Sequence, residues 1–186
     1  ISLVFLWRER SIKFKFLVLP DLNRENCTDI GSGSGLPGIV LAIIMKHKKS
    51  SMKFILYEKS FHKSNFLKEV TNKFDLNVEV LQKDVFAEKN INSDIIVARA
   101  FKPLPIILNL IQNNFKTFKE LILFIGKNQK KILADAKKKW DFQYVEKKSI
   151  TNSESVIIKI KNIKKKMKEK VISIINQKGG VGKTTT

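Results

Sequence analysis

Residues 29–38 read Asp-Ile-Gly-Ser-Gly-Ser-Gly-Leu-Pro-Gly, a pattern that could hold a nucleotide-like ligand. The segment follows one short apolar run and precedes another, so we predict a turn between a strand and a helix. Glycines at this spacing let the backbone turn sharply and approach a ligand without a Cβ clash. Pro37 suits the first turn of the following helix, where a missing N–H costs nothing.

The glycines alone leave the ligand open. Gly33, Gly35 and Gly38 fit the dinucleotide pattern G-x-G-x-x-G. Glu58 follows about 20 residues later, where a ribose-binding acid would stand. Counted from Asp29, the same segment fits the D-x-G-x-G-x-G loop of S-adenosylmethionine enzymes equally well. A third interpretation is a glycine-rich turn that binds nothing.

Strand and helix signals alternate along residues 27–160, which predicts βαβ units and a mostly parallel sheet. We predict a Rossmann-like α/β fold with a seven-stranded sheet and helices on both faces. The predicted helices cover residues 37–49, the stretch after Ser60, 104–115 and 132–140. The predicted strands cover residues 27–30, 54–58, 78–81, 94–98 and 121–125, with a closing antiparallel pair at 142–145 and 155–160.

Four residues with useful chemistry fall at the carboxyl ends of four successive predicted strands: Gly31, Glu58, Asp84 and Arg99. Ligands of parallel sheets bind outside these ends, so we expect the four to surround one pocket. The forked donors of Arg99 could hold a base or a phosphate. Its alternative role is an ion pair with Glu58 or Asp84.

Length and net charge indicate the size of the domain and the kind of partner. The 186 residues suffice for one domain with a sizeable core. The net charge of +19 favours RNA or DNA as a partner. The alternative is compositional drift in an AT-rich genome, because nearly all the basic residues are lysines.

We expect a cytoplasmic protein without a membrane span or a signal peptide. No apolar run reaches the roughly 18 residues that span a bilayer. Cys27 is the single cysteine, which excludes an internal disulfide. His47 and His62 have no partners at metal-ligand spacing, so we predict no metal site and place both on the surface.

Residues 27–160 resemble the bacterial small-subunit rRNA guanine-N7 methyltransferases, the glucose-inhibited division protein B family. The matching pieces are the glycine loop at 29–38, Phe-Leu-Lys-Glu-Val at 66–70 and Ala-Arg-Ala-Phe at 98–101. The resemblance implies an rRNA (guanine-N7)-methyltransferase with S-adenosylmethionine as methyl donor. It implies a guanine of 16S rRNA in the small ribosomal subunit as acceptor. We infer no stable protein partner.

The resemblance also implies the site residues, with Arg99 at the active-site mouth as the catalytic residue. Glu58 would hold the ribose hydroxyls, and the methionine side would lie along Gly31 and Leu36. Phe101 could stack on the acceptor base or belong to the core. The implied cofactor-binding residues are Gly31, Ser32, Gly33, Gly35, Leu36, Glu58, Asp84, Val85, Phe86 and Arg99, of which residues 84–86 would follow the adenine.

Guanine N7 carries an in-plane lone pair and no proton, so its attack on a sulfonium methyl needs alignment rather than a general base. The lack of a His–Asp or Cys–His constellation agrees with such a reaction. Two other classes stay open: a nicotinamide (NAD)-dependent oxidoreductase and a non-catalytic basic RNA-binding remnant.

The chain divides into four predicted parts. Residues 1–26 are expected to be a remnant of the family's amino-terminal region, and residues 27–160 the methyltransferase domain. Residues 161–170 read as a solvated lysine-rich linker. Residues 171–186 are expected to be a truncated P-loop segment, because Lys-Gly-Gly-Val-Gly-Lys-Thr at 178–184 resembles the deviant Walker A loop of ParA-type ATPases. We expect this P-loop segment to bind no ATP and to contribute nothing to the stability of the methyltransferase domain.

Overall fold

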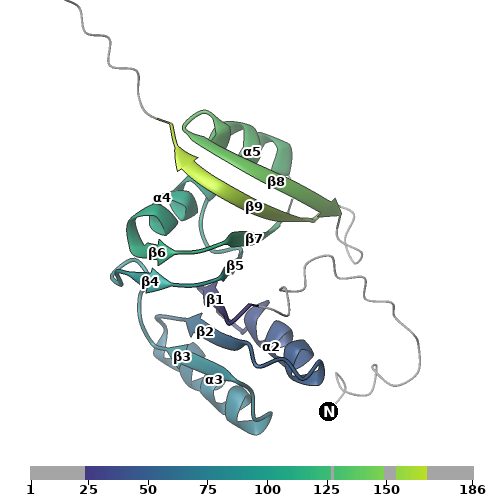
Figure 1. Ribbon diagram of the computed structural model, residues 1–186. Coiled ribbons are helices and arrows are strands. Elements are labelled where there is room, and N and C mark those ends of the chain that lie inside the picture. Colours follow the sequence, from purple (N-terminus) through teal and green to yellow (C-terminus); the bar gives the residue numbers. More distant parts are fainter. Residues whose placement is uncertain (1–23, 127, 149–153, 167–186) are drawn as a thin grey trace, which may run out of the picture.

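The computed structural model describes residues 24–126, 128–148 and 154–166 (Figure 1). The expectations for residues 1–23 and for the ParA-like segment at 171–186 lie outside these ranges.

The centre of the fold is a seven-stranded sheet in the order β3-β2-β1-β5-β7-β9-β8. Five neighbouring strands are parallel, and β9 runs antiparallel to both β7 and β8. This confirms the predicted seven-stranded, mostly parallel sheet. The strands are β1 (Asn26–Ile30), β2 (Lys53–Tyr57), β3 (Val78–Leu81), β5 (Ile95–Arg99), β7 (Glu120–Ile125), β8 (Trp140–Lys148) and β9 (Val156–Lys165).

Helices cover both faces of the sheet, as expected (Figure 1). Alternate residues of β5 show the division, because successive strand side chains point to opposite faces. Ile96 and Ala98 pack with α4 (Leu104–Asn114) and α5 (Gln129–Lys137), whereas Ile95 and Val97 pack with α2 (Gly38–His47) and α3 (Phe61–Lys73). No helix among the described residues is long and apolar enough to cross a membrane.

The structure differs from the sequence prediction at several places. The helix predicted over residues 132–140 ends at Lys137, and Trp140 begins β8 instead. A second, two-stranded sheet pairs β4 (Ile91–Asn92) with β6 (Phe115–Thr117), and strands this short leave no periodic signal. Strand β9 continues past the predicted boundary at residue 160 to Lys165, which pairs with Trp140. Its terminal lysines are exposed, so their charge marks solvated side chains and not the end of strand pairing. Ser60 stands at the N-cap of α3 without a side-chain capping bond.

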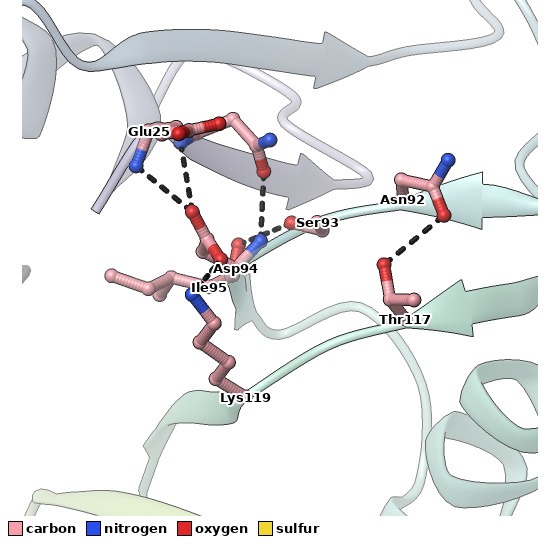
Figure 2. A network of polar contacts seen from close by, with 8 residues as sticks. Glu25, Asn92, Ser93, Asp94, Ile95, Thr117 and Lys119 are labelled. Carbon is pink, nitrogen blue, oxygen red and sulfur yellow. Dashed lines mark hydrogen bonds and ion pairs between the residues drawn. The ribbon is translucent and has the colours of Figure 1, made fainter.

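A polar network ties the amino ends of the central strands together, at the edge of the sheet where β1, β5 and β7 begin (Figure 2). The Asp94 Oδ2 accepts hydrogen bonds from the main-chain N–H of Glu25 at 2.8 Å and of Asn26 at 3.4 Å. Its Oδ1 pairs with the Lys119 ammonium at 2.7 Å. One carboxylate therefore joins three neighbouring strands.

Burial alone would raise the pKa of Asp94, but the hydrogen bond from Lys119 and the N–H groups of Glu25 and Asn26 outweigh it and hold the pKa below its usual value. A carboxyl with a lowered pKa stabilises the fold above about pH 4 and loses that contribution as the solution is acidified.

We expect Asp94→Ala to lower the free energy of unfolding by about 1–3 kcal/mol at pH 7, because it leaves two N–H donors without an acceptor. Urea denaturation measures the change, which should shrink at pH 3. Asp135→Ala is the control, since it removes only an exposed ion pair with Lys138 and should leave stability unchanged. Equal stability of the Asp94 variant and the wild type would contradict this role.

Candidate active site

A pocket of about 470 Å³ lies outside the carboxyl ends of β1, β2, β3 and β5. The structure brings nine of the ten residues expected to bind a cofactor to its wall; the tenth, Gly35, lies behind the loop. The nine are Gly31, Ser32, Gly33, Leu36, Glu58, Asp84, Val85, Phe86 and Arg99. A volume of this size is typical of small-molecule and cofactor sites.

Gly33 and Gly35 play different parts in the loop. Gly33 has a φ of +57°, and a Cβ built on it would find only the Gly31 carbonyl oxygen, 3.9 Å away. Its free side therefore opens into the pocket. Gly35, with a φ of +90°, leaves no room for a Cβ because Ile39 and Leu67 pack against it. Gly35 thus shapes the turn from behind and does not face a ligand.

Glu58 fastens the glycine loop to the end of β2. Its Oε2 accepts the N–H of Gly33 at 2.9 Å, and its Oε1 accepts the N–H of Ser60 at 2.8 Å. The Tyr57 carbonyl accepts two further loop N–H groups, from Gly31 and Ser32, both at 3.0 Å. The position of the loop is therefore fixed by the neighbouring strand as well as by its own turn.

Asp29 lies buried beneath the loop. Its Oδ2 accepts the N–H of Gly38 at 2.9 Å, and a Cβ at Gly38 would overlap that carboxylate. Its Oδ1 has no hydrogen-bond partner among the described residues, and the Ser32 hydroxyl donates to the Asp29 main-chain carbonyl. Burial raises the pKa of Asp29 to about 7; the Gly38 N–H and the nearby Ser32 hydroxyl oppose this rise, and the charge of Glu58 adds to it.

Arg99 ends β5 with an exposed side chain at the pocket. In the described ranges no ion pair joins it to Glu58 or Asp84, so the structure does not show its alternative role. The following residue, Ala100, has a φ of +48°, which is a strained value for a residue with a Cβ.

Phe101 lies between the core and the pocket. It is half-buried, packs against the core and lines the pocket. Its ring stacks on that of Phe86 with centroids 5.8 Å apart and an angle of 24° between the planes. A Cβ on Gly31 would overlap the Phe101 ring, so the glycine permits the close contact between the two strand ends.

Several residues of the pocket wall were missed by the sequence prediction: Ser34, Tyr57, Lys59, Lys63, Lys83, Ala100 and Lys102. Each lies within a few residues of a strand end at this edge, and that position was the signal available. His47 and His62 are not among the lining residues. In the described part of the chain, no group of three or more His, Cys, Asp and Glu is placed to hold a metal ion.

A second pocket of about 550 Å³ lies near the beginnings of β2 and β3. Its wall includes Lys46, but that ammonium is already held by the Asp75 carboxylate at 2.8 Å and by the Phe74 carbonyl at 3.0 Å. The second pocket contains neither the glycine loop nor Arg99, so the candidate site is the first pocket.

The fold and the glycine-loop pocket define the Rossmann-like class of nucleotide-cofactor proteins, and solved structures of similar fold are methyltransferases. A S-adenosylmethionine-dependent methyltransferase from Aquifex aeolicus superposes with a TM-score of 0.56 at 17% identity, over 77% of this chain and 83% of that chain. Mycoplasma capricolum TrmK in complex with S-adenosylhomocysteine gives a TM-score of 0.54 at 15% identity, over 75% and 62%.

Sequence comparison identifies the family. A family model for rRNA small subunit methyltransferase G matches residues 11–171. The ribosomal RNA small subunit methyltransferase G of Pelagibacter ubique is 48% identical over 161 residues, which cover 86% of this chain and 76% of that protein. The chain belongs to the rRNA small subunit methyltransferase G family, which confirms the resemblance drawn from the loop at 29–38 and the segment at 98–101.

We expect Asp29→Asn to change how stability depends on pH. The folded-state pKa of about 7 lies above the ordinary value of 3.8, so ionisation of Asp29 opposes folding. From this group the wild type loses up to about 1.4 kcal/mol of unfolding free energy per pH unit as the pH rises from about 4 to 7. Asparagine does not titrate, so the variant lacks this loss.

Urea denaturation of both proteins at pH 5, 6, 7 and 8 measures the difference. The difference in free energy of unfolding, Asp29→Asn minus wild type, should increase with pH up to about pH 7 and stay constant above it. Parallel curves over the whole range would contradict a raised pKa at Asp29.

Proposed function

We propose that this protein transfers a methyl group from S-adenosylmethionine to N7 of a guanine in 16S rRNA of the small ribosomal subunit. The observation that carries the proposal is the convergence of the glycine loop, Glu58 and Arg99 on one pocket in a member of the rRNA small subunit methyltransferase G family. Since the substrate is ribosomal, we infer that the protein works in the cytoplasm.

The residues of the pocket fit the proposed methyl donor. Glu58 uses one acceptor site on each oxygen for Gly33 and Ser60, and an ionised carboxylate has about four such sites. It therefore keeps acceptors for the two hydroxyls of a ribose. The open side of Gly33 lets the backbone approach a ligand closely. Asp84, Val85 and Phe86 line the same pocket, where the adenine would lie.

The bound cofactor supplies an electrophilic methyl group on a sulfonium. Guanine N7 supplies a lone pair and releases no proton, so the protein's task is to hold the base in line with the methyl group. Correct orientation alone can lower such a barrier by about 7–11 kcal/mol. The side chains at the pocket mouth agree with this task, because they include a guanidinium and an aromatic ring.

Arg99 is the residue we assign to the acceptor. Its exposed guanidinium stands at the pocket with no ion-pair partner among the described residues, and its forked donors match guanine O6 or a phosphate. Phe101 lies two residues further on, where its ring could stack on a base that leaves the RNA strand. The strained backbone at Ala100 separates the two and fixes their relative positions.

Membership of the family favours methyl transfer over the two other classes. An NAD-dependent oxidoreductase would also use Gly33 and Glu58, but the solved structures of similar fold named above are methyltransferases. A non-catalytic RNA-binding remnant would explain the charge and would not need a pocket lined by nine residues of a cofactor site.

We expect Gly33→Val to weaken S-adenosylmethionine binding at least about tenfold, because the isopropyl group fills the open side of the loop. Isothermal titration measures the affinity, and titration with NAD tests the alternative cofactor. Valine at a φ of +57° also costs about 1–2 kcal/mol of backbone strain, so circular dichroism must show that the variant folds.

The matched control for this variant is Gly126→Val. Gly126 has open space around a built Cβ and is absent from the pocket wall. The Gly126→Val protein should bind S-adenosylmethionine with the affinity of the wild type. Unchanged affinity in a folded Gly33→Val protein would overturn the assignment of the glycine loop.

We expect Arg99→Ala to reduce methyl transfer to unmodified small-subunit rRNA by about 10- to 100-fold, the loss of one charged hydrogen bond or a bidentate pair. The affinity for S-adenosylmethionine should change less than threefold. Arg99→Lys keeps the charge without the fork and should recover only part of the activity. Equal losses of methyl transfer and cofactor affinity would instead assign Arg99 to the cofactor.

A further inference from the structure

We propose that three lysines at the pocket mouth, Lys59, Lys63 and Lys102, bind phosphates of the RNA strand on both sides of the target nucleotide. We call these residues the lysine rim. The proposal rests on the proposed function and extends it from the acceptor base to the strand that carries it.

The rim lysines come from two sides of the pocket. Lys59 follows Glu58 at the end of β2, and Lys63 lies in the first turn of α3. Lys102 comes from the opposite side, after β5 and directly beyond Phe101. All three side chains are exposed, and none makes an ion pair or side-chain hydrogen bond with the described residues.

The acids of the pocket do not hold the rim lysines. Both Glu58 oxygens accept main-chain N–H groups, and Asp84 accepts the N–H of Phe86 at 3.0 Å. The other lysine of the wall, Lys83, is paired with Glu88 at 3.2 Å. With Arg99, the mouth carries four cations that make no ion pair within the described part of the chain.

The position of Lys63 argues against a role in stability. A helix amino terminus carries a partial positive charge, so a lysine in the first turn is electrostatically unfavourable. Helix α3 has no acidic residue in its first turn and no side-chain cap at Ser60; the carboxylate at this helix end is that of Glu58, which accepts the Ser60 N–H. A bound phosphate would meet Lys63 and this helix end together, so it would offset the unfavourable position of the lysine.

Lysine is abundant throughout this chain, so abundance alone does not distinguish the rim. Away from the pocket, many lysines have partners of their own. Lys159 and Lys161 approach the buried Glu120 carboxylate at 3.3 and 3.6 Å. Lys137 lies over the Tyr144 ring at 4.7 Å, and Lys165 over Trp140 at 5.9 Å. The rim is distinguished by its place: its cations have no such partners among the described residues and are gathered around the mouth of one pocket.

The chemistry fits a single RNA strand. A strand that delivers one splayed-out base to a pocket must run across its mouth, with a phosphate on each side of that base. Cations on the β2–α3 side and on the β5 side would meet those two phosphates. Such contacts fix the position of the strand and carry no base preference, which would be left to Arg99 and Phe101.

The test compares the full chain with Lys59→Gln/Lys63→Gln and with Lys102→Gln. Methyl transfer to small ribosomal subunits that lack the modification gives KM and kcat at several salt concentrations. Fluorescence anisotropy with an unmodified 16S rRNA transcript measures binding without activity, and isothermal titration measures S-adenosylmethionine affinity. The matched control is Lys139→Gln/Lys164→Gln, because both lysines are exposed and lie near the sheet edge opposite the pocket.

We expect the double variant of the rim to raise KM and the RNA dissociation constant at least about tenfold, with kcat and cofactor affinity within twofold of the wild type. The slope of log affinity against log salt should become shallower by about 0.7–0.9 per lysine removed. Lys102→Gln should show about half that change in slope, and the control pair none.

A rim variant with the RNA affinity and salt slope of the wild type, or of the control pair, would overturn the proposal. So would a loss of cofactor affinity that accounts for the change in KM, because the lysines would then bind the methyl donor. A wild-type chain that binds the transcript through the rim but transfers no methyl group would overturn the proposed function and leave the rim as an RNA-binding surface.

Discussion

The site depends on the fastening of the glycine loop to the end of β2. Three loop N–H groups, from Gly31, Ser32 and Gly33, are accepted by the Tyr57 carbonyl and the Glu58 carboxylate. Main-chain N–H groups must find acceptors when they leave water, and these acceptors lie on the neighbouring strand. The loop is thereby held beside the very acid proposed to bind the ribose, and register between β1 and β2 sets both positions.

A second set of contacts holds the strands together at the opposite edge of the sheet. Asp94 joins the starts of β1, β5 and β7, so these parallel strands are held in register at the ends away from the pocket. At the pocket edge, Phe101 packs on Gly31 and stacks on Phe86, which brings the ends of β5 and β1 and the segment after β3 into contact. Strand alignment at one edge and aromatic contact at the other hold Arg99 and Glu58 around one cavity.

Much of this could be predicted from the sequence because strand ends in a parallel sheet share one edge. Glu58 and Arg99 were found in this way, since each closes an apolar run. The role of Gly35 could not be predicted from the sequence, because only the packing of Ile39 and Leu67 shows that it faces away from the pocket. The lysines beyond residue 160 suggested a linker, whereas pairing with β8 allows exposed charges in a strand. Lys63 carried no signal in a chain so rich in lysine.

Three energetically unfavourable features lie in the pocket wall or directly beneath the glycine loop. Both carboxylate oxygens of Asp94 accept from donors, whereas Asp29 has a buried oxygen with no partner among the described residues and a pKa of about 7. Ala100 adopts a strained φ, and Lys63 stands at the wrong end of a helix dipole. Strained and incompletely paired groups tend to cluster at functional sites, so three of them around one cavity support binding there on physical grounds.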